Sequence, residues 1–107
     1  MKHNGKEIRI FFLALPIQVR GQSLEYTDEY LVGINESLAG ITKRHTIGHE
    51  LAHIFLNHFD DDCICPSDSE EQIEKKLNTV AAREKERQAN RAAWDYYRAY
   101  RDHSLTI

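Results

Sequence analysis

The N-terminal third of the chain has the hydrophobic pattern of short β-strands. The range Ile8–Leu15 is apolar, aromatic and β-branched, and Pro16 follows it, which suits a strand that ends or bulges at the edge of a sheet. Residues 18–26 are more polar, which predicts a turn or a second short strand. In the range Asp28–Ile34, every second side chain from residue 30 onward is apolar, which predicts a strand with one buried side. Its apolar side chains on one side are Tyr30, Val32 and Ile34. Two or three strands are therefore predicted, in antiparallel hairpins.

A segment with helical periodicity follows a turn at Asn35. Thr42 is the expected N-cap, so the predicted helix covers residues 43–59. Its apolar side chains recur one turn apart at Ile47, Leu51 and Phe55. Gly48 lies inside this helix, where glycine costs roughly 1 kcal/mol relative to alanine. That cost indicates the close approach of another backbone at Gly48.

The C-terminal part of the chain is predicted to be largely helical, because neither Gly nor Pro occurs after Pro66. Ser67 and Glu70 have the spacing of a capping box at its start. One helical stripe consists of Ile73, Leu77 and Val80. A second stripe, rotated away from the first, consists of Ala82, Glu86, Ala89, Asn90, Ala93, Tyr97 and Tyr100. Either two helices meet near residues 78–79, or one long helix contacts two neighbours.

The length and charge of the chain limit the number of domains and the kinds of partner that are expected. A chain of 107 residues is long enough for one hydrophobic core, so residues 1–107 are expected to form a single domain. The predicted fold class is α+β, with a small N-terminal antiparallel sheet packed on the helix of residues 43–59 and on C-terminal helices. A net charge of −3 without a basic stripe argues against direct binding of nucleic acid or a membrane surface. The apolar run Ile8–Val19 is too short and interrupted to span a membrane, and a cytoplasmic protein is expected.

The candidate chemistry lies in the sequence His49-Glu50-Leu51-Ala52-His53. Histidines four residues apart on a helix project from one face and can bind one Zn²⁺ ion together. The carboxylate of Glu50, beside the first histidine, is the candidate general base. This pattern is typical of a zinc hydrolase. The alternative is a core helix with polar histidines, but two buried imidazoles and a carboxylate without a metal would leave unpaired groups.

A catalytic zinc site usually has three protein ligands, so a third residue is needed. Glu86 is a carboxylate in an otherwise apolar or small-residue stripe, and two His with one Glu is a familiar zinc ligand set. The alternative for Glu86 is a solvated charge within the charged run of residues 83–87. Glu86 is the favoured third ligand on these grounds.

Other candidate ligands fit less well. His58 is one residue short of the spacing for a third histidine after a turn, and Asn57 replaces the glycine of that turn, so His58 is expected in a surface loop. Cys63 and Cys65 are soft enough to bind a metal, but free thiols are expected. His45 lies one turn before His49 and is more typical of a solvated residue in a first helical turn.

Two separated motifs occur in a fixed order: residues 30–58 contain the zinc-binding sequence, and residues 86–93 read Glu-Arg-Gln-Ala-Asn-Arg-Ala-Ala. Together they resemble the ImmA/IrrE family of small bacterial and phage zinc metallopeptidases. The resemblance covers residues 28–94 and implies a minimal zincin-like fold, with Glu86 as the third zinc ligand and Asn90 four residues after it. The aliphatic stretch that commonly follows in the family, ending in Leu-Met-Pro, is replaced here by the aromatic residues 94–100.

The expected function is that of a zinc metalloendopeptidase. His49, His53 and Glu86 are the expected Zn²⁺ ligands, and Glu50 is the expected catalytic base. The substrate backbone is expected to add as a strand to an exposed edge of the sheet. The family resemblance implies a protein substrate, such as a helix-turn-helix repressor of a mobile element or stress regulon. Candidates for a second oxyanion stabiliser are His45, Tyr96 and Tyr97.

Two alternatives remain open at the level of the sequence. The first is a non-catalytic, zinc-stabilised module that binds a protein partner in the manner of an antirepressor. The retained Glu50 disfavours it, because a purely structural zinc site usually has four ligands and needs no general base. The second is a metal-free interaction protein whose aromatic helix, residues 94–100, docks a partner. The metal content of the protein tests the second alternative, because the zinc-stabilised module and the peptidase would both contain zinc.

Overall fold

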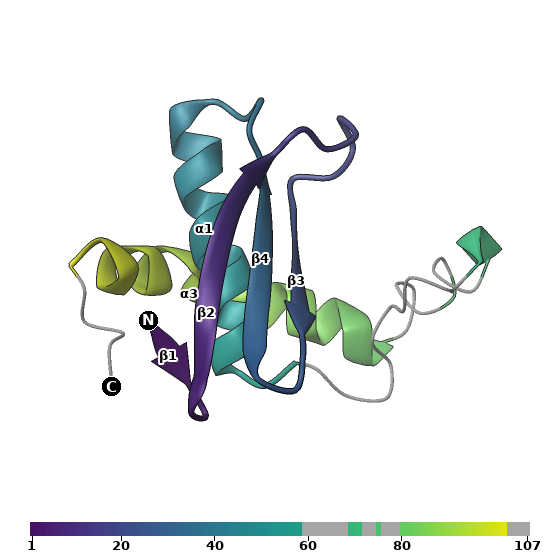
Figure 1. Cartoon of the computed structure of the whole chain (residues 1–107). Helices are drawn as coiled ribbons and strands as arrows, with labels where there is room; N and C mark the ends of the chain where they lie inside the picture. The colour runs from purple at the N-terminus through teal and green to yellow at the C-terminus, as the bar shows by residue number, and fades with distance from the viewer. Residues whose placement is uncertain (59–68, 72–74, 76–79, 103–107) are drawn as a thin grey trace.

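The computed structural model describes residues 1–58, 69–71, 75 and 80–102. Four strands come first along the chain, namely β1 (Lys2–His3), β2 (Lys6–Leu13), β3 (Gly21–Glu25) and β4 (Glu29–Asn35). The helices α1 (Gly40–Phe55) and α3 (Val80–Arg101) follow (Figure 1). The predicted α+β class is therefore confirmed. The predicted capping residue Ser67 and the stripe residues Ile73 and Leu77 lie outside the described residues.

The strands form one mixed sheet, in the order β1-β2-β4-β3. The pair β3/β4 is antiparallel, as predicted, and the short strand β1, which the sequence pattern did not predict, pairs antiparallel with β2. The central pair β2/β4 is parallel, so the prediction of a fully antiparallel sheet is wrong. The reason is the connection of residues 14–20 after β2. It is long enough for β3 to form one strand position away from β2, and the tight turn after β3 then returns β4 into the space between them.

The buried side chain of Asn35 holds the connection between β2 and β3 in place. Its Nδ2 donates to the carbonyl oxygens of Leu15, Pro16 and Val19 at 3.3, 3.3 and 2.9 Å. Its Oδ1 accepts hydrogen bonds from the backbone N and the Oγ of Ser37, at 3.1 and 2.8 Å. The predicted turn at Asn35 is confirmed, and the same residue fixes the crossover that makes the sheet mixed.

Helix α1 begins and ends earlier than predicted. Its N-cap is Ala39, without a side-chain hydrogen bond, so the predicted N-cap Thr42 is wrong. Thr42 instead lies in the first turn, where its carbonyl oxygen accepts a hydrogen bond from Thr46 Oγ1 at 2.8 Å. The helix starts early because the turn after β4 leads directly into it. Its last residue is Phe55, because Asn57 adopts a left-handed backbone with φ 56°.

The core lies between α1 and the face of the sheet formed mainly by β4, and Ile8 of β2 belongs to the same buried cluster. Its fully buried members are Tyr30, Val32 and Ile34 from β4 and Leu51 and Ile54 from α1. The predicted alternation in β4 and the predicted apolar stripe of α1 therefore meet in one cluster. Both helices lie on the same side of the sheet in Figure 1, and α1 contacts both the sheet and α3.

Helix α3 packs against α1 through the predicted second stripe. Ala89 and Ala93 are fully buried, whereas Tyr97 and Tyr100 pack at the border of the core. The small residues allow the two backbones to approach closely at Gly48. A Cβ atom at Gly48 would lie 1.8 Å from the carbonyl oxygen of Ala93, which explains the glycine inside α1.

The substitution Gly48→Ala is expected to destabilise the protein by at least roughly 2 kcal/mol, because the added methyl forces the helices apart. The better helix propensity of alanine stabilises the folded state by only about 1 kcal/mol and does not offset this cost. Urea unfolding followed by circular dichroism measures the difference. Gly40→Ala is the matched control, since the nearest atom to its added Cβ is the flexible Arg44 Nη2 at 3.9 Å. Equal stabilities of the two variants would contradict this packing.

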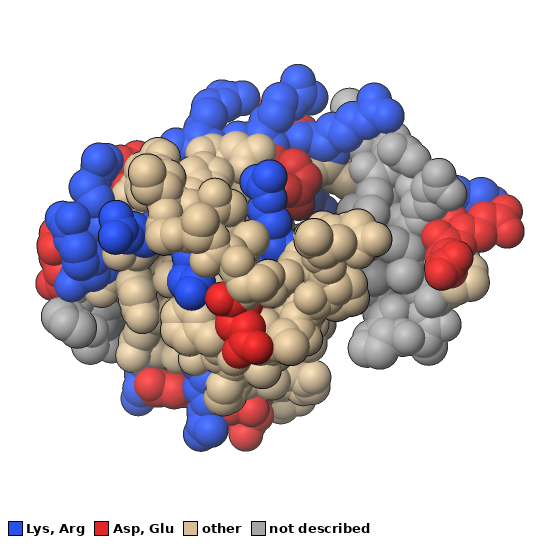
Figure 2. Space-filling model, turned by 90° about the horizontal axis from the view of Figure 1, so that it is seen from above, with Lys and Arg blue, Asp and Glu red and all other residues tan. Residues whose placement is uncertain are grey.

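Exposed apolar side chains gather at the end of the sheet where α1 begins. Ile17 is 88% exposed and Ile41 is 70% exposed. Viewed from above, uncharged residues fill most of the centre of this face, and Lys and Arg lie mainly at its borders (Figure 2).

Among the described residues, no helix combines the length and the apolar character required to cross a membrane.

Candidate metal centre

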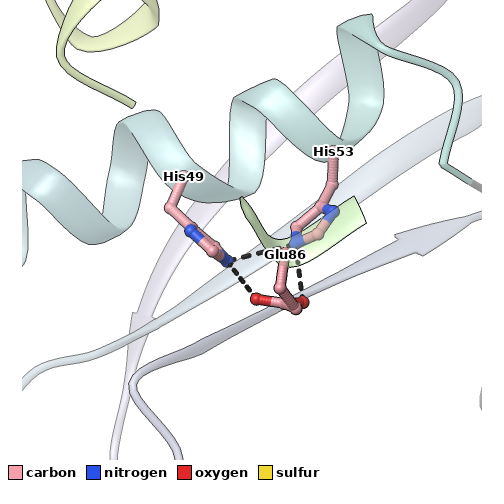
Figure 3. A group of neighbouring side chains, drawn as sticks. All are labelled: His49, His53 and Glu86. Atoms are coloured by element: carbon pink, nitrogen blue, oxygen red, sulfur yellow. Dashed lines mark hydrogen bonds and ion pairs between the residues drawn. The ribbon is translucent and has the colours of Figure 1, made fainter. Parts of the chain in front are cut away.

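Helix α1 brings His49 and His53 together as the sequence predicts. They lie four residues apart on one face of the helix, with 3.1 Å between their Nε2 atoms (Figure 3). Both rings are partly shielded from solvent, with side-chain exposures of 15% and 14%. The two Nε2 atoms therefore point to one shared position beside α1.

Glu86 completes this group from α3. Its Oε2 lies 2.9 Å from His49 Nε2, and its Oε1 lies 3.1 Å from His53 Nε2 (Figure 3). One donor atom from each of the three residues lies within 4.8 Å of the others. The residues that sequence reasoning selected as ligands are thus adjacent in space, although 33 positions separate Glu86 from His53. Their role as ligands remains a prediction.

The residues of this group shift one another's pKa values. Hydrogen bonds from His49 and His53 hold the pKa of Glu86 well below its ordinary value. Burial lowers the pKa of His49, but the hydrogen bond to Glu86 and the negative charges of Glu50 and Glu86 outweigh burial and raise it. The two Nε2 atoms and the Glu86 carboxylate oxygens face one another around a position that would attract a cation. The donor set of two imidazoles and one carboxylate therefore fits a divalent transition metal ion.

Glu50 lies beside this group but is held by a different element. Its side chain is only 7% exposed, and Ser23 Oγ on β3 donates a hydrogen bond to its Oε2. Ser23 Oγ also lies 3.2 Å from the Glu50 carbonyl oxygen. Gly21 leaves room for the carboxylate stem, because a Cβ there would lie 3.2 Å from Glu50 Cγ. Burial raises the pKa of Glu50, against the hydrogen bond from Ser23.

The outer nitrogens of both histidines also have partners. His49 Nδ1 lies 2.8 Å from Asn90 Oδ1, so the asparagine implied by the family resemblance contacts the site. His53 Nδ1 lies 2.9 Å from His58 Nδ1, and His58 Nε2 lies 2.9 Å from Gln88 Oε1. His58 was expected only as a surface loop residue, and sequence reasoning missed Gln88 because it lies off the apolar stripe. Ser23 was missed too, since a lone serine in a short polar strand carries no signal.

The remaining candidates are not part of the three-residue group, although the ring centroid of His45 lies 6.4 Å from that of His49. His45 stacks edge-on against Trp94, with 5.4 Å between ring centroids, and is not part of the three-residue group. Tyr96 stacks on Phe55 at 5.4 Å, and Tyr97 contacts Trp94 at 6.2 Å. Their proposed role as oxyanion stabilisers remains a prediction. Cys63 and Cys65 lie outside the described residues.

Comparison with known protein families identifies a match to most of the chain. The family described as the IrrE N-terminal-like domain matches residues 5–94, a range that contains β2, β3, β4, α1 and the three candidate ligands. No curated protein and no solved structure matches the chain. The match covers most of the chain and includes both motifs in their order. The chain therefore belongs to the IrrE N-terminal-like family of peptidases.

Proposed function

We propose that this protein is a zinc-dependent metallopeptidase that hydrolyses peptide bonds in a protein substrate. The observation that carries the proposal is the convergence of His49, His53 and Glu86 on one position, with a second acidic residue, Glu50, buried next to them but held by Ser23 instead. A purely structural metal site has no use for this spare carboxylate. In this arrangement, three residues are available to bind the metal and Glu50 is available to transfer protons.

Zinc is the metal that we propose for this donor set, since two His and one Glu are a common ligand set of catalytic zinc sites. A Zn²⁺ ion held there would act as a Lewis acid that acidifies water and polarises a carbonyl group. His49 and His53 provide its nitrogen donors from α1, and Glu86 provides carboxylate oxygen from α3. With three protein donors, one position would be left for the reactants.

Glu50 is the proposed general base. Its carboxylate accepts a proton from the attacking water and then donates it to the leaving amine. Burial raises its pKa, which suits a group that must both take and release a proton near neutral pH. The hydrogen bond from Ser23 fixes the position of the carboxylate during both steps.

Strand β3 is the proposed docking edge for the substrate. It is the last strand of the sheet order, and its outer side is an edge of the sheet in the described part of the chain. Asn35 N donates to Arg20 O, and Tyr26 N donates to Glu29 O, each at 2.8 Å. Hydrogen-bonded pairs alternate in an antiparallel ladder, so the residues between these pairs turn their backbone groups toward the free edge. Those residues include Gly21, Ser23 and Glu25.

This alternation gives Ser23 two functions in the proposal. Its backbone faces the edge where an extended peptide would pair, and its side chain holds Glu50. A peptide added to β3 would therefore be aligned by the same residue that positions the base. For the substrate itself, we propose a helix-turn-helix repressor, which rests on the family resemblance alone.

Removal of the metal tests this function directly. The zinc-loaded protein, a chelator-stripped sample and a stripped sample reloaded with Zn²⁺ are each incubated with a library of proteome-derived peptides, and new termini are identified by mass spectrometry. We expect cleavage by the loaded protein, a loss of at least roughly 100-fold on stripping, and recovery on reloading. Cleavage that survives complete removal of the metal, or no cleavage by a protein with one zinc per chain, would contradict the proposal.

A further inference from the structure

The turn at the end of α1 places His58 beside the metal centre. Asn57, in the left-handed conformation, donates its backbone N–H to Ile54 O at 3.1 Å, and the N–H of His58 donates to His53 O at 3.0 Å. These two bonds form a Schellman motif, with asparagine where glycine is commonest. The chain therefore folds back at Asn57, and the His58 side chain returns to His53.

A chain of hydrogen bonds then leads from His53 to α3. It joins His53 Nδ1 to His58 Nδ1 and His58 Nε2 to Gln88 Oε1, each at 2.9 Å. A single hydrogen atom lies between two ring nitrogens, so one of them must donate and the other must accept. Which nitrogen donates in these hydrogen bonds decides which nitrogen of His53 is free to bind a metal.

Only one direction agrees with the geometry of the site. His53 directs Nε2 toward Glu86 and His49, so a metal there requires Nε2 without a hydrogen and leaves the hydrogen on Nδ1. His53 Nδ1 must then donate to His58 Nδ1. A neutral His58 carries its own hydrogen on Nε2 and donates it to the oxygen of Gln88.

We infer that His58 and Gln88 are positioning residues that hold His53 in the tautomer and ring orientation required for metal binding. This inference rests on the proposed metal site but not on peptide cleavage. Asn90 Oδ1 supports His49 Nδ1 in the corresponding way at 2.8 Å. Helix α3 thus supplies one candidate ligand, Glu86, and the terminal acceptors of both histidine supports.

Substitutions at Gln88 test the direction of these hydrogen bonds. Because the Gln88 side chain is exposed, the variants are expected to fold as the wild type does. Gln88→Glu keeps an oxygen acceptor for His58 and is expected to retain or increase zinc affinity. Gln88→Lys offers only donors and is expected to weaken zinc affinity by roughly 10- to 100-fold, the range found for outer partners of metal ligands. Gln88→Leu removes the acceptor without adding a donor and is expected to fall between them.

Affinity is measured by competition with a chromophoric zinc chelator, and the absorption spectrum of the Co²⁺-substituted protein reports ligand geometry. Gln18→Glu and Gln18→Lys make the same charge changes at an exposed glutamine in the connection between β2 and β3. Measurements at low and high salt separate a general charge effect, which salt screens, from loss of the hydrogen bond. A shifted Co²⁺ spectrum in Gln88→Lys, restored in Gln88→Glu, would support the inference.

Several outcomes would overturn it. Equal zinc affinities for all three Gln88 variants would show that His53 needs no support from α3. The difference in zinc affinity between Gln88→Lys and Gln88→Glu could also disappear at high salt, or be reproduced by Gln18→Lys and Gln18→Glu. Either result would show that the difference comes from the added charge and not from the hydrogen bond to His58. A wild-type protein that binds zinc but cleaves no peptide would contradict the proposed function alone and leave this test intact.

Discussion

Replacing Glu50 with glutamine is expected to lower the rate of peptide cleavage by roughly 10²- to 10⁴-fold, the usual contribution of a general acid–base group. Zinc binding should persist, because Glu50 is not among the three converging donors. Glutamine keeps the shape of the side chain and an oxygen that can accept the hydrogen bond from Ser23. Cleavage kinetics and zinc content are measured on the same preparation.

The same substitution is expected to stabilise the metal-free protein. Burial raises the pKa of Glu50 above its ordinary value of 4.5, so the folded state disfavours the ionised carboxylate. The stability that depends on the protonated form is therefore complete at low pH and is lost as the pH rises through the raised pKa. Urea unfolding should show little difference between wild type and Glu50→Gln near pH 4 and a more stable variant at pH 7. Glu36→Gln, at an exposed turn residue, is the control.

Either of two results would contradict this role of Glu50. Cleavage by Glu50→Gln at the wild-type rate would mean that another group moves the proton. A variant that loses zinc together with activity would mean that Glu50 is itself a ligand or supports one.

Replacing Glu86 with glutamine is expected to weaken zinc binding by at least roughly 100-fold, more than the loss of an outer partner of a ligand. The carboxylate lies within 3.1 Å of both Nε2 atoms, and its removal leaves only two histidines as donors. Its negative charge also offsets the charge of a bound cation in a partly shielded site. Chelator competition measures the affinity of wild type and variant.

Glu84→Gln is the matched control for this experiment. It removes the same charge two residues earlier on α3, where Glu84 pairs with Arg87 and Arg91 at 3.3 and 3.8 Å. These exposed pairs contribute little to stability, so zinc binding should be unchanged. If Glu86→Gln and Glu84→Gln bind zinc equally well, Glu86 is a charged residue near the site and not a ligand.

Much of the local structure follows from the sequence pattern. The alternation at Tyr30, Val32 and Ile34 predicts a strand with one buried side, and the stripe through Leu51 predicts the buried side of α1. The order of the strands does not follow in the same way. It depends on the connection of residues 14–20, which Asn35 holds through three carbonyl groups, and no periodic pattern encodes such a crossover.

The candidate site divides along similar lines. His49 and His53 can be paired from helical periodicity alone, because residues four apart on a helix are neighbours. Glu86 can be selected as a carboxylate in a stripe of small residues, and Gly48 already indicates where the second helix approaches. His58 cannot be placed this way, since its position depends on the left-handed conformation of Asn57.

Ser23 illustrates a second limit of sequence reasoning. Its contact with Glu50 exists because β3 lies at the edge of the sheet beside α1, and that placement results from the crossover. Contacts between elements that are distant in sequence depend on topology, whereas the pattern within one element depends only on its own periodicity. The support for Glu50 therefore becomes visible only in the folded chain.

X-ray absorption at the zinc edge, on protein purified without chelator and containing a measured amount of zinc per chain, tests the central claim most directly. We expect one zinc per chain, coordinated only by nitrogen and oxygen atoms at about 2.0–2.2 Å, with two of them from imidazole. A metal-free protein that refuses added Zn²⁺ would contradict the account. So would sulfur scattering at about 2.3 Å, because it would place the zinc on Cys63 or Cys65 instead of on His49, His53 and Glu86.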